Sequence, residues 1–138
     1  MIDSEPSRAT ARGSIVVSTY DPRPWSEVPG GPTLNLIHVV ERFEGDIEGD
    51  GEVYFVQAAQ PDGGASFVGQ ERVTGSLAGR GGSFVLQDTG TVQGSRVSGS
   101  WFVVPGSGTG ELAGLRGEGG FQAELGQNAS ITLDYWFE

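Results

Sequence analysis

Apolar and polar residues alternate along most of the chain in short runs that are rich in Val, Ile, Thr and aromatic residues. Successive side chains of a strand point to opposite faces, so each run predicts a strand with one buried face. No segment keeps a helical period. The predicted strands cover residues 13–20, 33–43, 52–58, 65–74, 83–92, 96–104, 119–124 and 130–137.

Turn residues separate these strands at short and fairly even intervals. Asp50-Gly51 is a tight-turn pair, and residues 61–64 read Pro-Asp-Gly-Gly. About eight strands joined mostly by hairpins favour an all-β fold, a single closed antiparallel β-barrel, because closure removes exposed edges. We expect this barrel over residues 13–138, after a polar tail over residues 1–12.

Two connections differ from simple hairpins. Residues 21–32 contain four prolines and predict a long irregular loop, which could cap an opening of the barrel as a lid. The glycine-rich stretch before residue 119 predicts a crossing that closes one barrel end. There Leu112 and Leu115 are expected to plug the core, with some of the glycines at positive φ.

Strand alternation places two carboxylates on inner faces. Glu71 shares a face with Phe67 and Val73, and Asp88 shares one with Phe84 and Leu86. The other residues expected to point inward are Trp101, Val103, Phe121, Ala123, Ile131, Leu133, Tyr135 and Phe137.

The strand over residues 33–43 leaves two alternatives open, because one bulge would exchange its faces. One face carries Asn35, Ile37, Val39, Glu41 and Phe43, and the other carries Leu34, Leu36, His38, Val40 and Arg42.

An unpaired buried carboxylate costs several kcal/mol, so each inner carboxylate must be paired, protonated or hydrated. In one reading Glu71 pairs with Arg42 or Arg116, or accepts hydrogen bonds. In the other, Glu71 or Asp88 is a catalytic acid or base in an aromatic cage that could include Trp101, Phe67, Phe84 and Tyr54. The candidate ligand-binding residues are Trp25, Asn35, His38, Tyr54, Phe67, Phe84, Trp101 and Tyr135.

The amino-acid composition argues against several classes of binding partner. Among 138 residues, 24 are glycine and the formal net charge is −10, which argues against nucleic acid and anionic membranes as partners. Without cysteine there is no disulfide and no thiolate metal site. No apolar run approaches the roughly 18 residues of a transmembrane helix, and the N-terminus lacks a secretory apolar region. We expect a cytoplasmic protein.

Several motif matches lack their structural context. Residues 108–113 fit a dinucleotide fingerprint, but no parallel βαβ unit follows. The acidic residues 46–51 resemble the start of a calcium loop whose twelfth position is Gln57 instead of Glu. Asn128-Ala-Ser130 is a glycosylation sequon only in a secreted setting. His38, the sole histidine, has no ordered set of partners, so we predict no metal and no cofactor.

Four segments carry a family resemblance: SFVGQERVTG (66–75), GSFVLQDTGT (82–91), WFVVPGSGTGELAGLRGEGGF (101–121) and the ending LDYWFE. They resemble a bacterial family catalogued as domain of unknown function 3224, with a barrel like that of allene oxide cyclase. The resemblance implies a six-to-eight-stranded antiparallel barrel with an interior cavity. Plant allene oxide cyclases bind an unstable fatty-acid epoxide in such a cavity and guide its ring closure. Their catalytic residues do not map onto this sequence, so only the fold carries over.

Three functional hypotheses follow. The cavity binds a small lipophilic molecule, or it is the active site of an isomerase or cyclase that uses Glu71 or Asp88 without metal or nucleotide. Alternatively, the protein forms a homo-oligomer and acts through its outer surface without catalysis.

Overall fold

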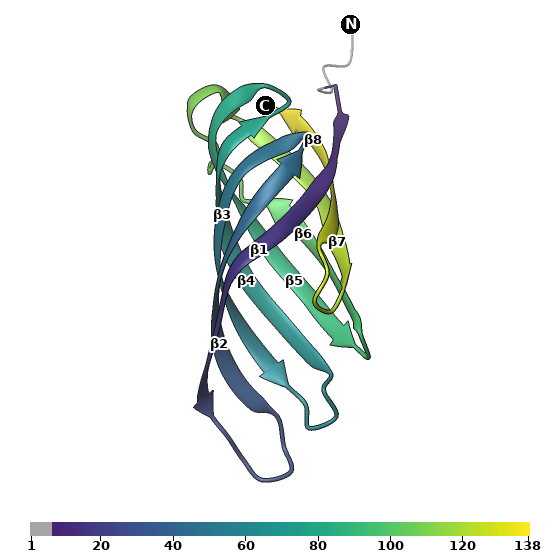
Figure 1. Ribbon diagram of the computed structural model, residues 1–138. Helices are drawn as coiled ribbons and strands as arrows, with labels where there is room; N and C mark the ends of the chain where they lie inside the picture. The colour runs from purple at the N-terminus through teal and green to yellow at the C-terminus, as the bar shows by residue number, and fades with distance from the viewer. Residues whose placement is uncertain (1–6) are drawn as a thin grey trace, which may run out of the picture.

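Eight antiparallel strands form a closed barrel in which every strand pairs with its neighbours in sequence, and β1 pairs with β8 (Figure 1). This computed structural model describes residues 7–138 and confirms the predicted all-β barrel. The strands are β1 (Ala9–Ser26), β2 (Thr33–Gly45), β3 (Ile47–Ala59), β4 (Ala65–Leu77), β5 (Arg80–Gln93), β6 (Arg96–Val103), β7 (Leu115–Glu124) and β8 (Ala129–Phe137), with a short 3-10 helix, η1 (Gly110–Leu112), between β6 and β7.

β1 is longer than its sequence pattern predicts at both ends. It begins at Ala9, inside the segment expected as a tail; residues 1–6 of that segment lie outside the described residues. It continues to Ser26, so the expected loop over residues 21–32 is wrong for its first half. The remaining residues 27–32 connect β1 to β2 in a hairpin that projects furthest at the lower end of the barrel (Figure 1).

The prolines of β1 are tolerated because this part of the strand pairs on one side only. The ladder between β1 and β8 stops at Ile15, opposite Ala129, whereas Pro22 and Pro24 pair with β2 alone. Proline cannot donate to a ladder and is therefore confined to such edge positions. A register shift between Val17 and Thr19 adds a bulge in the same strand.

The register of β2 settles which of its faces points inward. Ile37, Val39, Glu41 and Phe43 are buried, while the alternate residues between them are more exposed. The set containing Glu41 is therefore the inner one. The inward faces predicted for β4 to β8 are confirmed by the buried positions on each strand.

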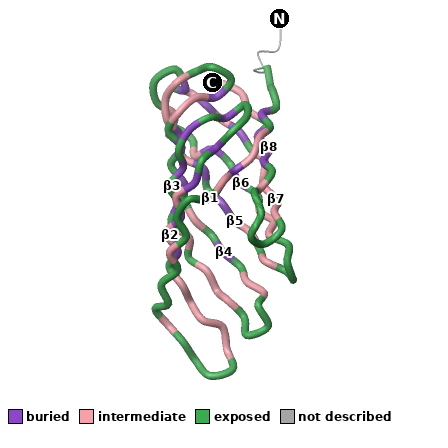
Figure 2. Tube along the Cα trace, viewed as in Figure 1, coloured by how far each residue is buried: buried purple, intermediate pink, exposed green. Residues whose placement is uncertain are grey.

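The upper end of the barrel is packed solid, and buried residues are concentrated there (Figure 2). The segment between β6 and β7 crosses this end and places Leu112 and Leu115, both at most 1% exposed, in the main core cluster. Gly110 and Gly114 adopt φ values of 61° and 84°, which favour glycine. The predicted plug is confirmed, with its glycines at two of the turning points.

Candidate functional site

A pocket of about 570 Å³ occupies the interior at the end opposite η1. It opens where β1 and β8 have separated. Val17 and Tyr20 line it from β1, residues 125–128 line it from the turn between β7 and β8, and Ala129 lines it from the start of β8. Sites for small molecules typically measure about 300–1,000 Å³. The barrel is therefore filled by side chains at one end and hollow enough for a small ligand at the other.

Aromatic side chains form most of one wall of this pocket. The ring of Phe67 lies 5.0 Å from that of Phe55 and 6.2 Å from that of Phe121, measured between centroids, and Phe121 lies 5.0 Å from Trp101. Trp101 Nε1 donates a hydrogen bond to the Thr132 carbonyl at 3.0 Å, so the indole's polar atom is already satisfied. The wall offers a ligand apolar contact area and ring faces.

Three carboxyl groups lie at the boundary between the pocket and the packed core. Glu41 follows the pocket-lining Val39 on the inner face of β2 and precedes Phe43 of the core. Asp88 of β5 follows Leu86 of the core in the same way. Glu41 and Asp88 line the pocket and form what we call the pocket floor.

Glu71 of β4 lies just behind this floor. Its carboxyl occupies the space left by Gly51 of β3, where a Cβ would overlap Glu71 Oε2 and lie 2.8 Å from Phe43 Cε1. Gly51 pairs with Glu41 on one side and Val73 on the other. The missing side chain on β3 therefore lets carboxyls from β2 and β4 approach each other across it.

The electrostatics of the three carboxyls follow from burial and from their mutual proximity. Burial raises the pKa of Asp88 from 3.8 to about 8, and the charge of Glu41 adds to this effect. Burial first, then the carboxyls of Glu41 and Asp88, hold the pKa of Glu71 well above its usual range. Burial also raises the pKa of Glu41, while its contact with Glu71 lowers it. This pattern fits a protonated Glu71 that donates a hydrogen bond to the Glu41 carboxylate.

The arginine partners expected for Glu71 are wrong. Arg42 pairs with Asp50 and Arg116 pairs with Glu138, both at the surface. Within residues 7–138, no N–H or hydroxyl donates to either oxygen of Glu71 or to Oδ1 of Asp88. Burial thus favours the neutral form of both carboxyls, and no arginine of the described residues forms an ion pair with either.

The expected site residues are distributed over three environments. Phe67 and Trp101 line the pocket with Asp88. Phe84 and Tyr135 belong to the packed upper core instead. The remaining residue of the inner face is Asn35, which faces the lower interior and donates to Gln57 Oε1 at 3.0 Å.

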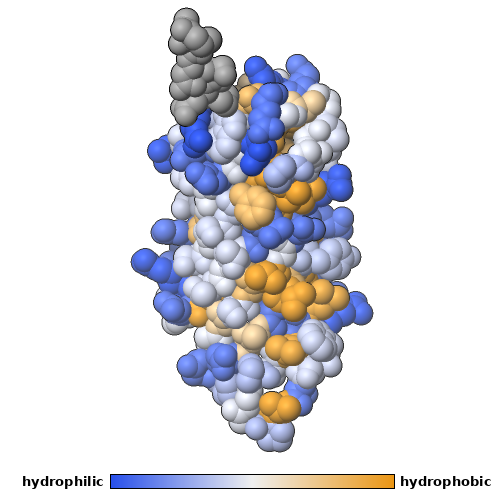
Figure 3. Space-filling view, turned by 180° about the vertical axis from the view of Figure 1, so that it is seen from behind, coloured by the Kyte–Doolittle hydropathy of each residue, from blue (hydrophilic) through white to orange (hydrophobic). Residues whose placement is uncertain are grey.

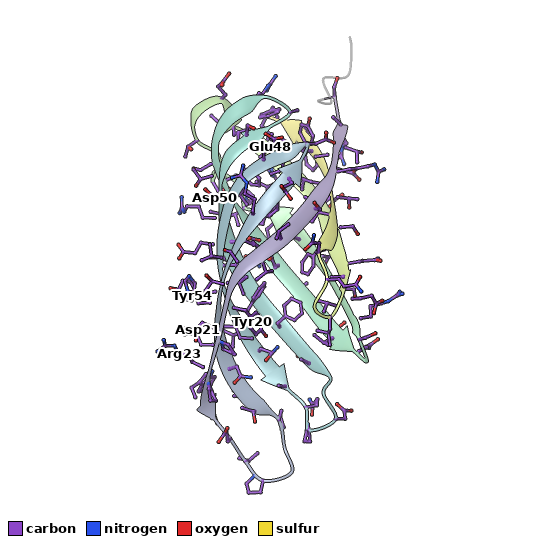
Figure 4. The ribbon with its side chains drawn as sticks, viewed as in Figure 1. Tyr20, Asp21, Arg23, Glu48, Asp50 and Tyr54 are labelled. Atoms are coloured by element: carbon purple, nitrogen blue, oxygen red, sulfur yellow. The ribbon has the colours of Figure 1, made fainter. Side chains whose placement is uncertain are left out.

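His38, Tyr54 and Trp25 do not join the interior cage, which corrects the expectation for Tyr54 in particular. The register places His38 opposite Tyr54 on the outer face, with their rings stacked 4.5 Å apart and His38 Nε2 2.7 Å from Glu52 Oε2. Tyr54 lies beside Asp21 and Arg23 on that outer side (Figure 4). Trp25 is 61% exposed and lies outside the pocket lining.

A second, shallower depression of about 960 Å³ runs along the outside of β3 to β8. Its rim includes the exposed apolar side chains of Val56, Val68 and Phe102. Apolar patches among charged side chains are visible on the face seen from behind (Figure 3). It is larger than the interior pocket and Asp88 also lines it, but it is more open to solvent, and only the interior pocket has both Glu41 and Asp88 on its lining, so we take the interior pocket as the candidate site.

Sequence reasoning missed Glu41, Tyr20 and Phe55 as pocket residues. The signal for Glu41 was its place between Val39 and Phe43, but the opposite face of β2 is equally apolar. Tyr20 was assigned to the end of a strand that in fact continues. Phe55 carried no distinguishing signal.

Within residues 7–138, no three or more His, Cys, Asp or Glu side chains are grouped closely enough to hold a metal ion. The same residues contain no helix long and apolar enough to cross a membrane.

Comparison with known proteins agrees with the fold. A family model described as a protein of unknown function, DUF3224, matches residues 11–135. A crystal structure of a DUF3224 protein of unknown function from Shewanella oneidensis MR-1 is 30% identical, with a TM-score of 0.76, and the match covers 97% of this chain and 99% of that one. A search of curated proteins finds no match. With a family model spanning nearly its whole length, this chain belongs to the DUF3224 family.

Proposed function

We propose that the protein binds a small, largely apolar molecule in the interior pocket. The observation that carries this proposal is the 570 Å³ space bounded by aromatic rings and floored by Glu41 and Asp88. Leaving such a space unfilled forgoes packing contacts, and burying carboxyls costs free energy, so both features are expensive for stability alone. Both are explained if a ligand supplies the missing contacts.

A neutral apolar dye tests the proposal. N-phenyl-1-naphthylamine should gain fluorescence on binding to the wild-type protein. Val97→Phe adds volume inside the pocket and should abolish the signal, whereas Val68→Phe makes the same change on the outer face and should leave it intact. Equal binding by both variants would place the dye elsewhere and contradict the proposal.

One observation favours acid–base catalysis as a second candidate. A carboxyl with a pKa of about 8 inside an apolar pocket is matched to proton transfer near neutral pH. Asp88 would then donate a proton to a substrate oxygen and take it back, as an isomerase or cyclase requires. Glu71 would not contact the substrate, and it would affect the pKa of Asp88 through its contact with Glu41.

A chromogenic probe tests this candidate. Ionised Asp88 should abstract a proton from 5-nitrobenzisoxazole and open its ring, with a rate that rises as the pH passes about 8. Asp88→Asn should lose this rate, and the surface variant Asp50→Asn should keep it. A rate that is the same in wild type and Asp88→Asn would rule out Asp88 as the base.

A further inference from the structure

Among residues 7–138, the buried charged side chains are all acidic: Glu41, Glu71 and Asp88. Asp88 is 2% exposed, lines the pocket and has an oxygen, Oδ1, without a hydrogen-bond partner among residues 7–138. Glu41 lies beside it on the floor, and both oxygens of Glu71 behind it also lack donors. Asp88 Oδ1 is thus a buried oxygen at the pocket lining without a partner among residues 7–138, whereas buried polar atoms in proteins normally have one.

No basic side chain of the protein can be that partner. The eight arginines all lie in the described part of the chain and none of them is buried, and the one histidine, His38, lies on the outer face stacked on Tyr54. The arginine nearest in sequence to the floor, Arg42, points outward to Asp50. A positive charge that stabilises the ionised form of Asp88 would therefore have to enter with the ligand.

The walls suit an organic cation better than a metal ion. The carboxyls come from β2, β4 and β5 and do not form a group that could hold a metal. The pocket volume far exceeds that of a single ion, and the rings of Phe67, Trp101 and Phe121 offer faces that attract ammonium groups. An anionic ligand would be repelled by the floor and by the net charge of −10.

We propose that the pocket selects apolar molecules that carry a basic amine, with the ammonium group placed over Asp88 and Glu41 and the apolar part against the aromatic wall. This inference rests on the proposed binding function and names its ligand class.

Such binding is coupled to proton release. In the empty pocket burial keeps the Asp88 carboxyl protonated near neutral pH, and an ammonium at the floor stabilises the carboxylate instead. Amine binding should therefore strengthen as the pH rises from 6 towards 8. The titratable groups closest to Asp88 in its electrostatics are Glu41 on β2 and Glu71 on β4, and Tyr20 on β1 and Glu124 on β7 line the same pocket. The inner faces of β3, β6 and β8 contribute none near the pocket.

Calorimetry with three ligands of one carbon skeleton tests the inference: 4-phenylbutylamine, 4-phenyl-1-butanol and 4-phenylbutyrate. With the full chain at pH 7.5, the amine should bind about tenfold or more tightly than the alcohol, and the carboxylate least. Comparing phosphate with Tris buffer should reveal protons released on amine binding. Asp88→Asn should lose the preference for the amine but keep alcohol binding, and Asp50→Asn should behave as wild type.

The possible outcomes distinguish a failure of this inference from a failure of the proposed binding function. If the alcohol binds as tightly as the amine, or the carboxylate binds best, this inference is wrong while the binding function stands. If none of the three binds, both are wrong. Glu41→Gln, at the same floor, provides the measurement should Asp88→Asn not fold, and unchanged amine preference in a folded floor variant overturns the inference.

Discussion

Glu71 and Asp88 could be placed inside the barrel from sequence because each alternates with large apolar residues along a single strand. The side chains that contact these two carboxyls could not be predicted. Whether Arg42 reaches Glu71 depends on the face that β2 turns inward, and both faces of that strand carry apolar residues. The register places Arg42 outside and Glu41 inside, so a third acid takes the interior position that Arg42 would hold if the other face of β2 pointed inward.

The raised pKa values make the protein less stable as the pH increases. Between pH 4 and 8 the folded protein holds a proton on Asp88 that the unfolded chain has lost. The unfolding free energy should therefore fall across this window by up to about 1.4 kcal/mol per pH unit for this group, with Glu71 and Glu41 acting in the same direction. Urea unfolding at a series of pH values measures this slope.

Asp88→Asn should flatten the slope and stabilise the protein at pH 8, with little change at pH 4, because the amide never has to ionise. Asp50→Asn, at a surface ion pair, serves as the control and should leave the slope as it is. A slope unaltered by Asp88→Asn would mean that the pKa of the Asp88 carboxyl is not raised by folding.

The position of Gly51 tests the contact behind the pocket floor. Gly51→Ala would push a methyl group against the Glu71 carboxyl and Phe43, so it should destabilise the protein by about 1–3 kcal/mol. At Gly81 a Cβ would meet only ordinary contacts, at 3.8 Å and beyond, and Gly81→Ala should be close to neutral. Similar unfolding midpoints for the two variants would disagree with the packing around Gly51.

Among the elements, the hairpins were predictable and the long first strand was not. Most turns combine glycine with a polar residue, and these signals are local. Pro22 and Pro24 in β1 also looked like turn signals, because sequence alone does not reveal that this stretch pairs on one side only. The first half of the expected lid continues β1 beyond Tyr20, which lines the pocket, and no residue of 21–32 lines it.

The plug formed by η1 should contribute stability without touching ligand. Leu112→Ala removes a fully buried side chain from the packed end and should cost about 2–5 kcal/mol. The outward-facing Leu36, 43% exposed, is the control, and Leu36→Ala should cost under about 1 kcal/mol. Dye affinity in folded Leu112→Ala should equal that of wild type. A loss of affinity would show that the plug and the pocket are coupled.

On the scale of the whole molecule, the barrel has one closed end and one open end. The carboxyls of Glu41, Glu71 and Asp88 lie where the packed core meets the pocket. Alternation and hairpin spacing were enough to predict the closed sheet, since both are repeated on every strand. The pocket could not be located from sequence, because its mouth depends on where β1 and β8 stop pairing. Assembly into a homo-oligomer and a cytoplasmic location stay predictions.

The carboxyl titration of Asp88 tests most directly whether this residue of the pocket floor is protonated at neutral pH in the protein without ligand. In protein labelled with carbon-13 at the aspartate carboxyl, the Asp88 resonance can be assigned by its absence from Asp88→Asn. It should titrate with a midpoint near 8 in the free protein. A midpoint near the ordinary value of 3.8 would mean that the carboxyl is charged and hydrated at neutral pH, which would contradict the pocket floor as described.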